Sequence, residues 1–335
     1  MDIATGLFAL ESLPRTMQVA VHESGQKSSQ SAPAILTRGF SDLGRITVHR
    51  RAAKHFEPCK RQHMMTLFDV RSRLRHLRQL LAQDSIPMAG KMDALRIFLQ
   101  RKTKVGGRNS IRLSHARIFV DRQSAIVDLH VFAQAFLDQI YDSINLTGRV
   151  VIDIGAHKGY FAAYALSKGV KAVLCYEPEE SNFQALCLFS RSITSAQQPV
   201  EVHREAVGND NEMDLYVSVD SWAHTTVSRG DHAYTKKIKI ASRSLASILA
   251  AVKERFPRDE FVLKIDAEGA ECQLLLQTPR ELFSSVREII FEFHEFAGCS
   301  IGEIIDRLVS IGYEYVADSK DVDVYHLRTG KTTAR

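Results

Sequence analysis

A glycine-containing segment at residues 150–160, VVIDIGAHKGY, has the residue types of a ligand-binding turn. The apolar residues that begin it predict a buried parallel strand, which delivers Asp153 and Gly155 into a tight turn. Gly159 then opens a predicted helix. Glycines at such a turn let the backbone come close to a ligand, and the helix start offers unpaired N–H groups. The spacing differs from the dinucleotide fingerprint G-x-G-x-x-G and from the P-loop, so the turn alone does not name its ligand.

A carboxylate follows about two dozen residues later in the chain. The segment 171–179, KAVLCYEPE, reads as a short apolar strand that ends at Glu177. At the end of a second strand in nucleotide-binding folds, an acidic residue holds ribose hydroxyls, because a carboxylate can accept two hydrogen bonds from a vicinal diol. Glu177 is therefore a candidate for contact with a ribose.

The segment KIDAEGAE, which begins at Lys264, carries more charge than a buried strand normally holds. An ammonium among apolar strand residues is costly unless a carboxylate pairs with it, and Asp266, Glu268 and Glu271 are the nearest candidates. Lys264 or Asp266 could orient or deprotonate an acceptor hydroxyl. Alternatively, the charges form a salt-bridge network that fixes the loop. Three carboxylates in six residues could also hold a divalent cation, but they show no fixed ligand spacing, so we expect no metal.

Two further segments carry groups that could act on a substrate. Glu292 and His294 alternate along a predicted strand and share a face, and His294 is a candidate general base because its ordinary pKa lies near neutral pH. The loop 220–237 holds the single tryptophan, Trp222, together with threonines and histidines. These side chains suit stacking against a sugar or ring, although Trp222 could equally anchor an ordinary surface loop.

Four motifs together resemble the signature set of the FkbM family of S-adenosylmethionine-dependent methyltransferases. They are DIGAHKGY, YEP, FVLKIDAEGAE at residues 261–271 and EIIFEFHE at residues 288–295. The resemblance covers roughly residues 112–327. It implies a class I methyltransferase fold with S-adenosyl-L-methionine as cofactor.

The resemblance also implies roles for individual residues. The glycine loop would lie along the methionine part of the cofactor, Asp153 would contact its amino group and Glu177 would hold its ribose. By position, the turn 205–207 would cover the adenine. The expected cofactor-binding residues are Asp153, Gly155, Ala156, His157, Gly159, Glu177, Ala206 and Asp266. The expected catalytic residues are Lys264, Asp266, Glu268 and His294.

These residues require a sheet whose strands alternate with helices. Such alternation predicts an α/β fold with a mostly parallel seven-stranded sheet, helices on both faces and a C-terminal hairpin that provides one antiparallel edge strand. The predicted strands are 150–154, 172–176, 200–206, 213–219, 237–241, 261–266, 288–293, 313–317 and 322–327, with an extended segment at 111–121. The predicted helices are 64–83, 91–101, 131–144, 160–168, 181–190, 245–255, 270–277 and 301–311.

The net charge of +5 is distributed unevenly along the 335 residues. Residues 1–110 contain 19 Lys/Arg and 8 Asp/Glu, so the rest of the chain is mildly acidic. A basic arm could contact nucleic acid, an anionic membrane or an acidic partner, or it could simply be solvated. We predict a poorly ordered polar segment at 1–60, a basic helical extension at 61–110 and a methyltransferase domain at 111–330.

The five cysteines include no C-x-x-C pair. Cys175 and Cys272 lie in apolar or helical patterns and suit small buried side chains. We therefore expect neither a zinc site nor a disulfide framework, and a reducing cytoplasm is the expected location. No apolar stretch approaches the length of a transmembrane helix, and the N-terminus lacks the pattern of a secretory signal.

The sequence thus favours S-adenosylmethionine-dependent methyl transfer to a hydroxyl of a small molecule or glycan. One alternative is methylation of protein or nucleic acid gripped by the basic N-terminal helices. A salt-sensitive affinity for nucleic acid would favour it. Another alternative is a non-catalytic cofactor-binding module that forms oligomers through residues 62–105. Saturable cofactor binding without any methylated product would favour that reading.

Overall fold

The computed structural model describes residues 70–100, 108–121, 123–194, 199–209, 211–229, 233–316 and 323–330. The predicted polar segment at 1–60 lies outside these ranges. The predicted helix 64–83 is described from residue 70 onward, as α2 (Val70–Ala82).

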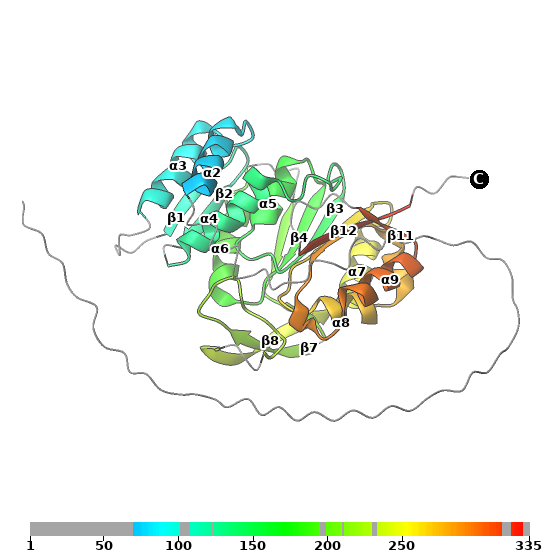
Figure 1. Ribbon diagram of the computed structural model, residues 1–335. Coiled ribbons are helices and arrows are strands. Elements are labelled where there is room, and N and C mark those ends of the chain that lie inside the picture. Colours follow the sequence, from blue (N-terminus) through cyan, green and yellow to red (C-terminus); the bar gives the residue numbers. More distant parts are fainter. Residues whose placement is uncertain are drawn as a thin grey trace, which may run out of the picture. The chain divides into compact units, whose positions relative to one another are not determined.

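A seven-stranded sheet forms the centre of the fold (Figure 1). Its strand order is β11 (Tyr313–Val316), β12 (Val324–Thr329), β10 (Val286–Glu292), β9 (Phe261–Ile265), β3 (Val150–Ile154), β4 (Ala172–Tyr176) and β5 (Val200–His203). The five strands from β10 to β5 are parallel, so their carboxyl ends meet at one edge of the sheet. The sheet is therefore mostly parallel, as the alternation of strands and helices predicted.

The antiparallel strand has a different place from the one predicted. β12 is antiparallel both to β10 and to β11, and it lies between them. The edge strand is therefore β11, while the antiparallel strand is paired on both sides. The sequence did not reveal this because two consecutive strands can enter a sheet in either order.

Helices cover both faces of the sheet, and the central strands alternate between the two cores. Val151 packs in one core with α5 (Tyr160–Ser167) and α6 (Glu180–Arg191). Val150, Ile152 and Ile154 pack in the other. The helices on that second side are α7 (Leu245–Arg255), α8 (Glu271–Gln277) and α9 (Ile301–Ser310). Continuous apolar strands of this kind are expected where both faces are buried.

The region after β5 differs from the predicted long strand at 200–206. The chain leaves the main sheet after His203 and enters a separate sheet of β6 (Ala206–Gly208), β8 (Lys236–Ser244) and β7 (Asn211–Val217). Arg204 and Glu205 connect the two sheets. Ala206 is thereby placed next to the ends of the main strands.

The segment before β3 also differs from the prediction. The expected helix 131–144 begins earlier, as α4 (Ala125–Ala133), and continues into a short π-helical stretch, η1 (Gln134–Asp138). It ends at Gln139, whose φ is 55°. Before α4, β1 (Arg108–Arg112) and β2 (Arg117–Asp121) form an antiparallel pair.

The N-terminal helices share a core with this domain. Leu80 of α2 and Ile97 of α3 (Met88–Gln100) are buried in the cluster that contains α4 and α5. Asp93 of α3 also pairs with Arg112 of β1. Within the described residues, no helix combines the length and apolar character needed to cross a membrane.

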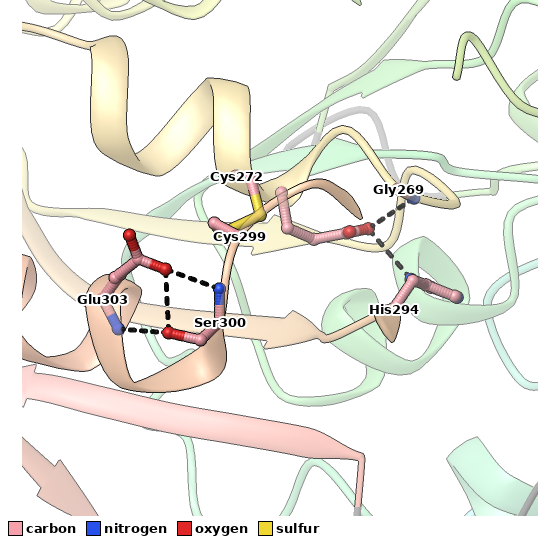
Figure 2. The surroundings of a disulfide bond; sticks show 7 residues. Gly269, Cys272, His294, Cys299, Ser300 and Glu303 are labelled. Atoms are coloured by element: carbon pink, nitrogen blue, oxygen red, sulfur yellow. Dashed lines mark hydrogen bonds and ion pairs between the residues drawn. A yellow bond between two sulfur atoms is a disulfide. The ribbon is translucent and has the colours of Figure 1, made fainter. Parts of the chain in front are cut away.

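Cys272 and Cys299 form a disulfide, which the sequence analysis did not anticipate (Figure 2). The bond joins α8 to the residue before the capping box of Ser300 and Glu303 at the start of α9. The prediction of no disulfide is therefore wrong, and the argument for a reducing location loses its basis. The sequence hid the pair because nothing in a separation of 27 residues shows that the two elements are neighbours.

Cys299→Ser is expected to lower the free energy of unfolding by about 2–4 kcal/mol, because the cross-link limits the unfolded chain. Urea unfolding with and without reductant measures the effect. Reductant should destabilise the native protein and leave Cys299→Ser unchanged. Cys187, which is a free cysteine, provides the control variant Cys187→Ser. A native midpoint that does not respond to reductant would contradict the prediction.

Candidate active site

A cavity of about 430 Å³ lies at the carboxyl ends of the parallel strands. This size is within the range of small-molecule sites. Most of the residues singled out from the sequence line it, namely Gly155, Ala156, His157, Glu177, Ala206, Lys264, Asp266 and Glu268. Asp153, Gly159 and His294 are not among the lining residues. They lie outside the lining of the cavity, and Asp153 and His294 are fully buried.

The turn after β3 is shaped by its first glycine. Gly155 has φ +73°, and a Cβ at this position would lie 1.8 Å from the carbonyl oxygen of Asp266. The backbone N–H groups of Gly155 and Ala156 both donate to the carbonyl of Tyr176, at 3.0 and 3.1 Å. The turn is thereby fixed against β4 and β9, and only glycine fits at its start.

Glu177 is held by the backbone on two sides. The N–H of His157 donates to Oε2 and the N–H of Glu179 donates to Oε1, both at 2.9 Å. Burial raises the pKa of the Glu177 carboxyl to about 7, although these hydrogen bonds favour its charged form. The carboxylate thus ties the glycine turn to the end of β4 while it lines the cavity.

Lys264 joins three parts of the site. Its Nζ lies 3.2 Å from Oδ1 of Asp153 and 3.7 Å from Oδ2 of Asp266, and it donates to the carbonyl of Gly155 at 2.9 Å. Burial opposes the charged amine, but the two carboxylates outweigh it and raise the pKa of Lys264 well above its ordinary value. The charged lysine therefore fixes the turn, and it has no lone pair with which to act as a base.

His294 lies between carboxylates rather than free at a strand end. Its Nδ1 is 3.1 Å from Oε1 of Glu271, and its Nε2 is 3.2 Å from Oε2 of Glu268 and 3.7 Å from Oε1 of Glu292. Burial lowers the pKa of the imidazole, but Glu268 and Glu271 reverse this and raise it well above its ordinary value. While it is protonated, His294 cannot act as the general base considered from the sequence.

Glu271 has a larger part in the site than the sequence indicated. Its side chain is fully buried. Oε1 accepts from the N–H groups of Gly269 and Ala267 and contacts Nδ1 of His294. The dashed lines that end on Gly269 and His294 in Figure 2 mark two of these interactions. Its position at the first residue of α8 places it under the turn that carries Glu268.

A second buried ion pair supports the glycine turn from α4. Nζ of Lys158 lies 2.8 Å from both carboxylate oxygens of Asp128, and it also donates to Ser124 Oγ at 2.6 Å. Lys158 and Asp128 are 2 % and 0 % exposed. The sequence analysis did not identify Asp128, because its partner is 30 residues away and no local pattern links them.

Lys158→Met is expected to lower the free energy of unfolding by about 3–5 kcal/mol, since it leaves the buried carboxylate of Asp128 without its cation. Urea unfolding followed by circular dichroism measures this effect. The control is Lys168→Met, which removes a partly exposed pair with Asp142 and should change stability little. Equal effects of the two substitutions would contradict this account.

The loop that contains Trp222 closes another side of the cavity. Trp222, His224 and Thr226 are among the lining residues. The loop is fixed to the site because Thr225 Oγ1 donates to the carbonyl of Glu268. Tyr141, which the sequence analysis did not identify, also lines the cavity. Of the predicted segments, this loop and the turn at Ala206 therefore face the same space as the glycine turn.

A parallel α/β sheet with a cavity beyond the carboxyl ends of its strands defines a Rossmann-like ligand-binding fold. Residues 153–315 match the family described as the methyltransferase FkbM domain. The chain therefore contains an FkbM methyltransferase domain, and the resemblance of the four sequence motifs is confirmed. None of the curated proteins compared with this chain matches it.

Several solved structures match this chain at low sequence identity. A candidate RNA methyltransferase from Pyrococcus horikoshii is 12% identical, with a TM-score of 0.32 over 74% of this chain and 100% of the other. A candidate S-adenosylmethionine-dependent methyltransferase from Streptococcus mutans is 7% identical, with a TM-score of 0.35 over 68% and 57%. A candidate tRNA methyltransferase from Streptococcus pneumoniae, solved with S-adenosyl-L-methionine, is 13% identical, with a TM-score of 0.34 over 59% and 73%.

Proposed function

We propose that this protein transfers a methyl group from S-adenosyl-L-methionine to a hydroxyl of a small molecule or glycan. The observation that carries the proposal is the convergence of the Gly155 turn and the Glu177 carboxylate in one cavity of an FkbM methyltransferase domain. S-adenosylmethionine supplies an already activated methyl group. The protein then has to align the acceptor and assist loss of one proton.

The residues at this end of the sheet suit the parts of that cofactor. Glu177 offers carboxylate oxygens to the two ribose hydroxyls. The turn at Gly155, Ala156 and His157 leaves room along its backbone, because no side chain projects at Gly155. Ala206 and Val207 give an apolar wall for the adenine. Asp153 is buried beside Lys264, so we propose that it acts on the cofactor's amino group through the turn or a water molecule.

We propose that the acceptor lies between the Trp222 loop and the carboxylates after β9. Trp222 offers a ring that can stack on a sugar or an aromatic acceptor. Asp266 and Glu268 present carboxylate oxygens to the cavity and orient the acceptor hydroxyl. Lys264 and His294 hold these two carboxylates from behind, so we assign them a positioning role.

Incubation with methyl-labelled S-adenosylmethionine and host extract, followed by mass spectrometry, tests the proposal. A labelled small molecule or glycan is the expected product. Label that is released by nuclease or protease would favour a polymer acceptor instead. Cofactor binding without any labelled product would favour a non-catalytic module.

Cofactor affinity is expected to rise with pH between about 6 and 8. Glu177 has a pKa near 7, and a diol that donates to both oxygens favours its ionised form. Binding at lower pH must therefore release a proton, which weakens the apparent affinity. Calorimetry in buffers of different ionisation enthalpy measures both the affinity and the released proton. Equal affinities at the two ends of this range would contradict the prediction.

Below about pH 7, the stability of the free protein should change with pH in the opposite direction to the cofactor affinity. Between the ordinary pKa of 4.5 and the folded value of about 7, the folded state binds more protons at Glu177 than the unfolded state does. The contribution of Glu177 to stability therefore falls as pH rises through this window. In Glu177→Gln both pH effects should disappear, which makes that variant the control.

A further inference from the structure

Asp266, Glu268 and His294 converge on one point beside the cavity. One ligand atom from each side chain lies within 4.8 Å of the other two. Around an ion bonded at about 2.1 Å, ligand atoms are roughly 3–4 Å apart, so small side-chain rotations suffice. We infer that these three side chains form a binding site for a divalent cation. This replaces the expectation of no metal, which considered only the local spacing of the carboxylates.

His294 gives the second observation in favour of an ion. Its side chain is 0 % exposed, and Nε2 is buried without a hydrogen-bond partner among the residues that the structure describes. Nε2 lies 3.2 Å from Oε2 of Glu268 and 3.7 Å from Oε1 of Glu292. A buried ring nitrogen that faces two carboxylates is arranged as a metal ligand would be.

Glu271 holds this arrangement in place. Binding of the ion would displace the Nε2 proton to solvent. With Nδ1–H directed at Oε1 of Glu271, the lone pair on Nε2 would then face the proposed ion. Ligating histidines in proteins are commonly fixed in this way by a carboxylate on the second nitrogen. The same oxygen accepts the N–H of Gly269, next to Glu268, so one side chain orders both the histidine and the carboxylate turn.

The donor set selects among cations. Two carboxylates and one imidazole suit a divalent first-row ion such as Mn²⁺ or Zn²⁺, whereas Ca²⁺ takes six to eight oxygen ligands. Three protein ligands would leave coordination positions on the ion open. Because Asp266 and Glu268 face the cavity, a molecule in the cavity could occupy such a position. The role of the ion rests on the proposed function, because an acceptor hydroxyl bound at an open position would lose its proton more easily.

Titration of Mn²⁺ into the full-length protein, after removal of metal with a chelator, tests the site. Electron paramagnetic resonance of free Mn²⁺ should show one ion bound per chain. Asp266→Asn and His294→Gln should weaken binding by about 100-fold, and Glu271→Gln by about 10-fold, as for groups that orient a ligand. The matched control is Glu205→Gln, which removes a carboxylate of the same cavity that pairs with Arg243. Its Mn²⁺ affinity should stay within about twofold of the native value.

Absence of saturable binding of Mn²⁺ and of Zn²⁺ would overturn the inference, as would native affinity in Asp266→Asn. In either case the cluster is an ion-pair network around His294. If His294→Gln does not fold, Asp266→Asn decides, because Asp266 is only partly buried. Calorimetry of S-adenosylmethionine binding without metal reports on the proposed function separately. Cofactor binding without cation binding would remove this inference alone.

Discussion

Glu177→Ala is expected to weaken S-adenosylmethionine binding by about 100-fold or more. Two hydrogen bonds to a charged group contribute roughly 1.5–3 kcal/mol each, and about 1.4 kcal/mol corresponds to a factor of ten in affinity. The substitution also leaves the N–H groups of His157 and Glu179 without their acceptor, so the glycine turn loses an anchor. Isothermal calorimetry measures the dissociation constant.

The control for this experiment is Glu180→Ala, three residues further along the chain. Glu180 begins α6, and its carboxylate pairs with Arg204 in a partly exposed position. Glu180→Ala should bind the cofactor as the native protein does. Unchanged affinity in Glu177→Ala would refute the assignment of Glu177, whatever the acceptor proves to be.

Gly155→Ala is expected to lower the free energy of unfolding by about 2–5 kcal/mol and to remove cofactor binding. The cost combines a left-handed backbone, about 1–2 kcal/mol, with overpacking, about 1–3 kcal/mol. The added Cβ would meet backbone atoms of Asp266, which cannot move aside as a flexible side chain can. Either the turn or β9 must shift, and both line the cavity. Urea unfolding and calorimetry measure the two effects.

Gly169→Ala separates the cost of the left-handed backbone from the cost of overpacking. Gly169 has φ +77°, close to that of Gly155, but no atom lies within 4 Å of the position that its Cβ would take among the described residues. Its substitution should cost only the backbone term of about 1–2 kcal/mol and leave cofactor binding intact. Equal losses in the two variants would mean that the close approach to Asp266 contributes nothing.

The sequence predicted the framework of the site correctly where the signal was local. The apolar runs before Asp153, Glu177 and Lys264 form adjacent parallel strands, so the groups at their ends meet as expected. The family of the domain followed from the same motifs. The roles assigned to individual residues stay predictions, and the variants above test them.

Errors arose where the outcome depends on contacts between distant segments. Cys272 suits a buried thiol by its local pattern, yet the packing of α9 against α8 brings it and Cys299 into one disulfide. The role of His294 as a base stays a prediction, but its contact with Glu271 of α8 could not be predicted from the local pattern. The strand predicted at 200–206 divides because the chain passes from one sheet to another at Arg204.

By itself, the sequence determined the alternation of strands and helices in the main parallel sheet, the glycine turn and the methyltransferase family. These features can be read from short segments of the chain, because the periodicity of apolar residues, the conformational freedom of glycine and the order of residues in a motif are local properties. Only the tertiary structure decided which charges are paired, as in Lys158 with Asp128 and Lys264 with Asp153. A charged side chain is stable in the protein interior only if the fold brings an opposite charge within a few ångströms of it. The separation of two residues in the sequence does not reveal which residue that partner is.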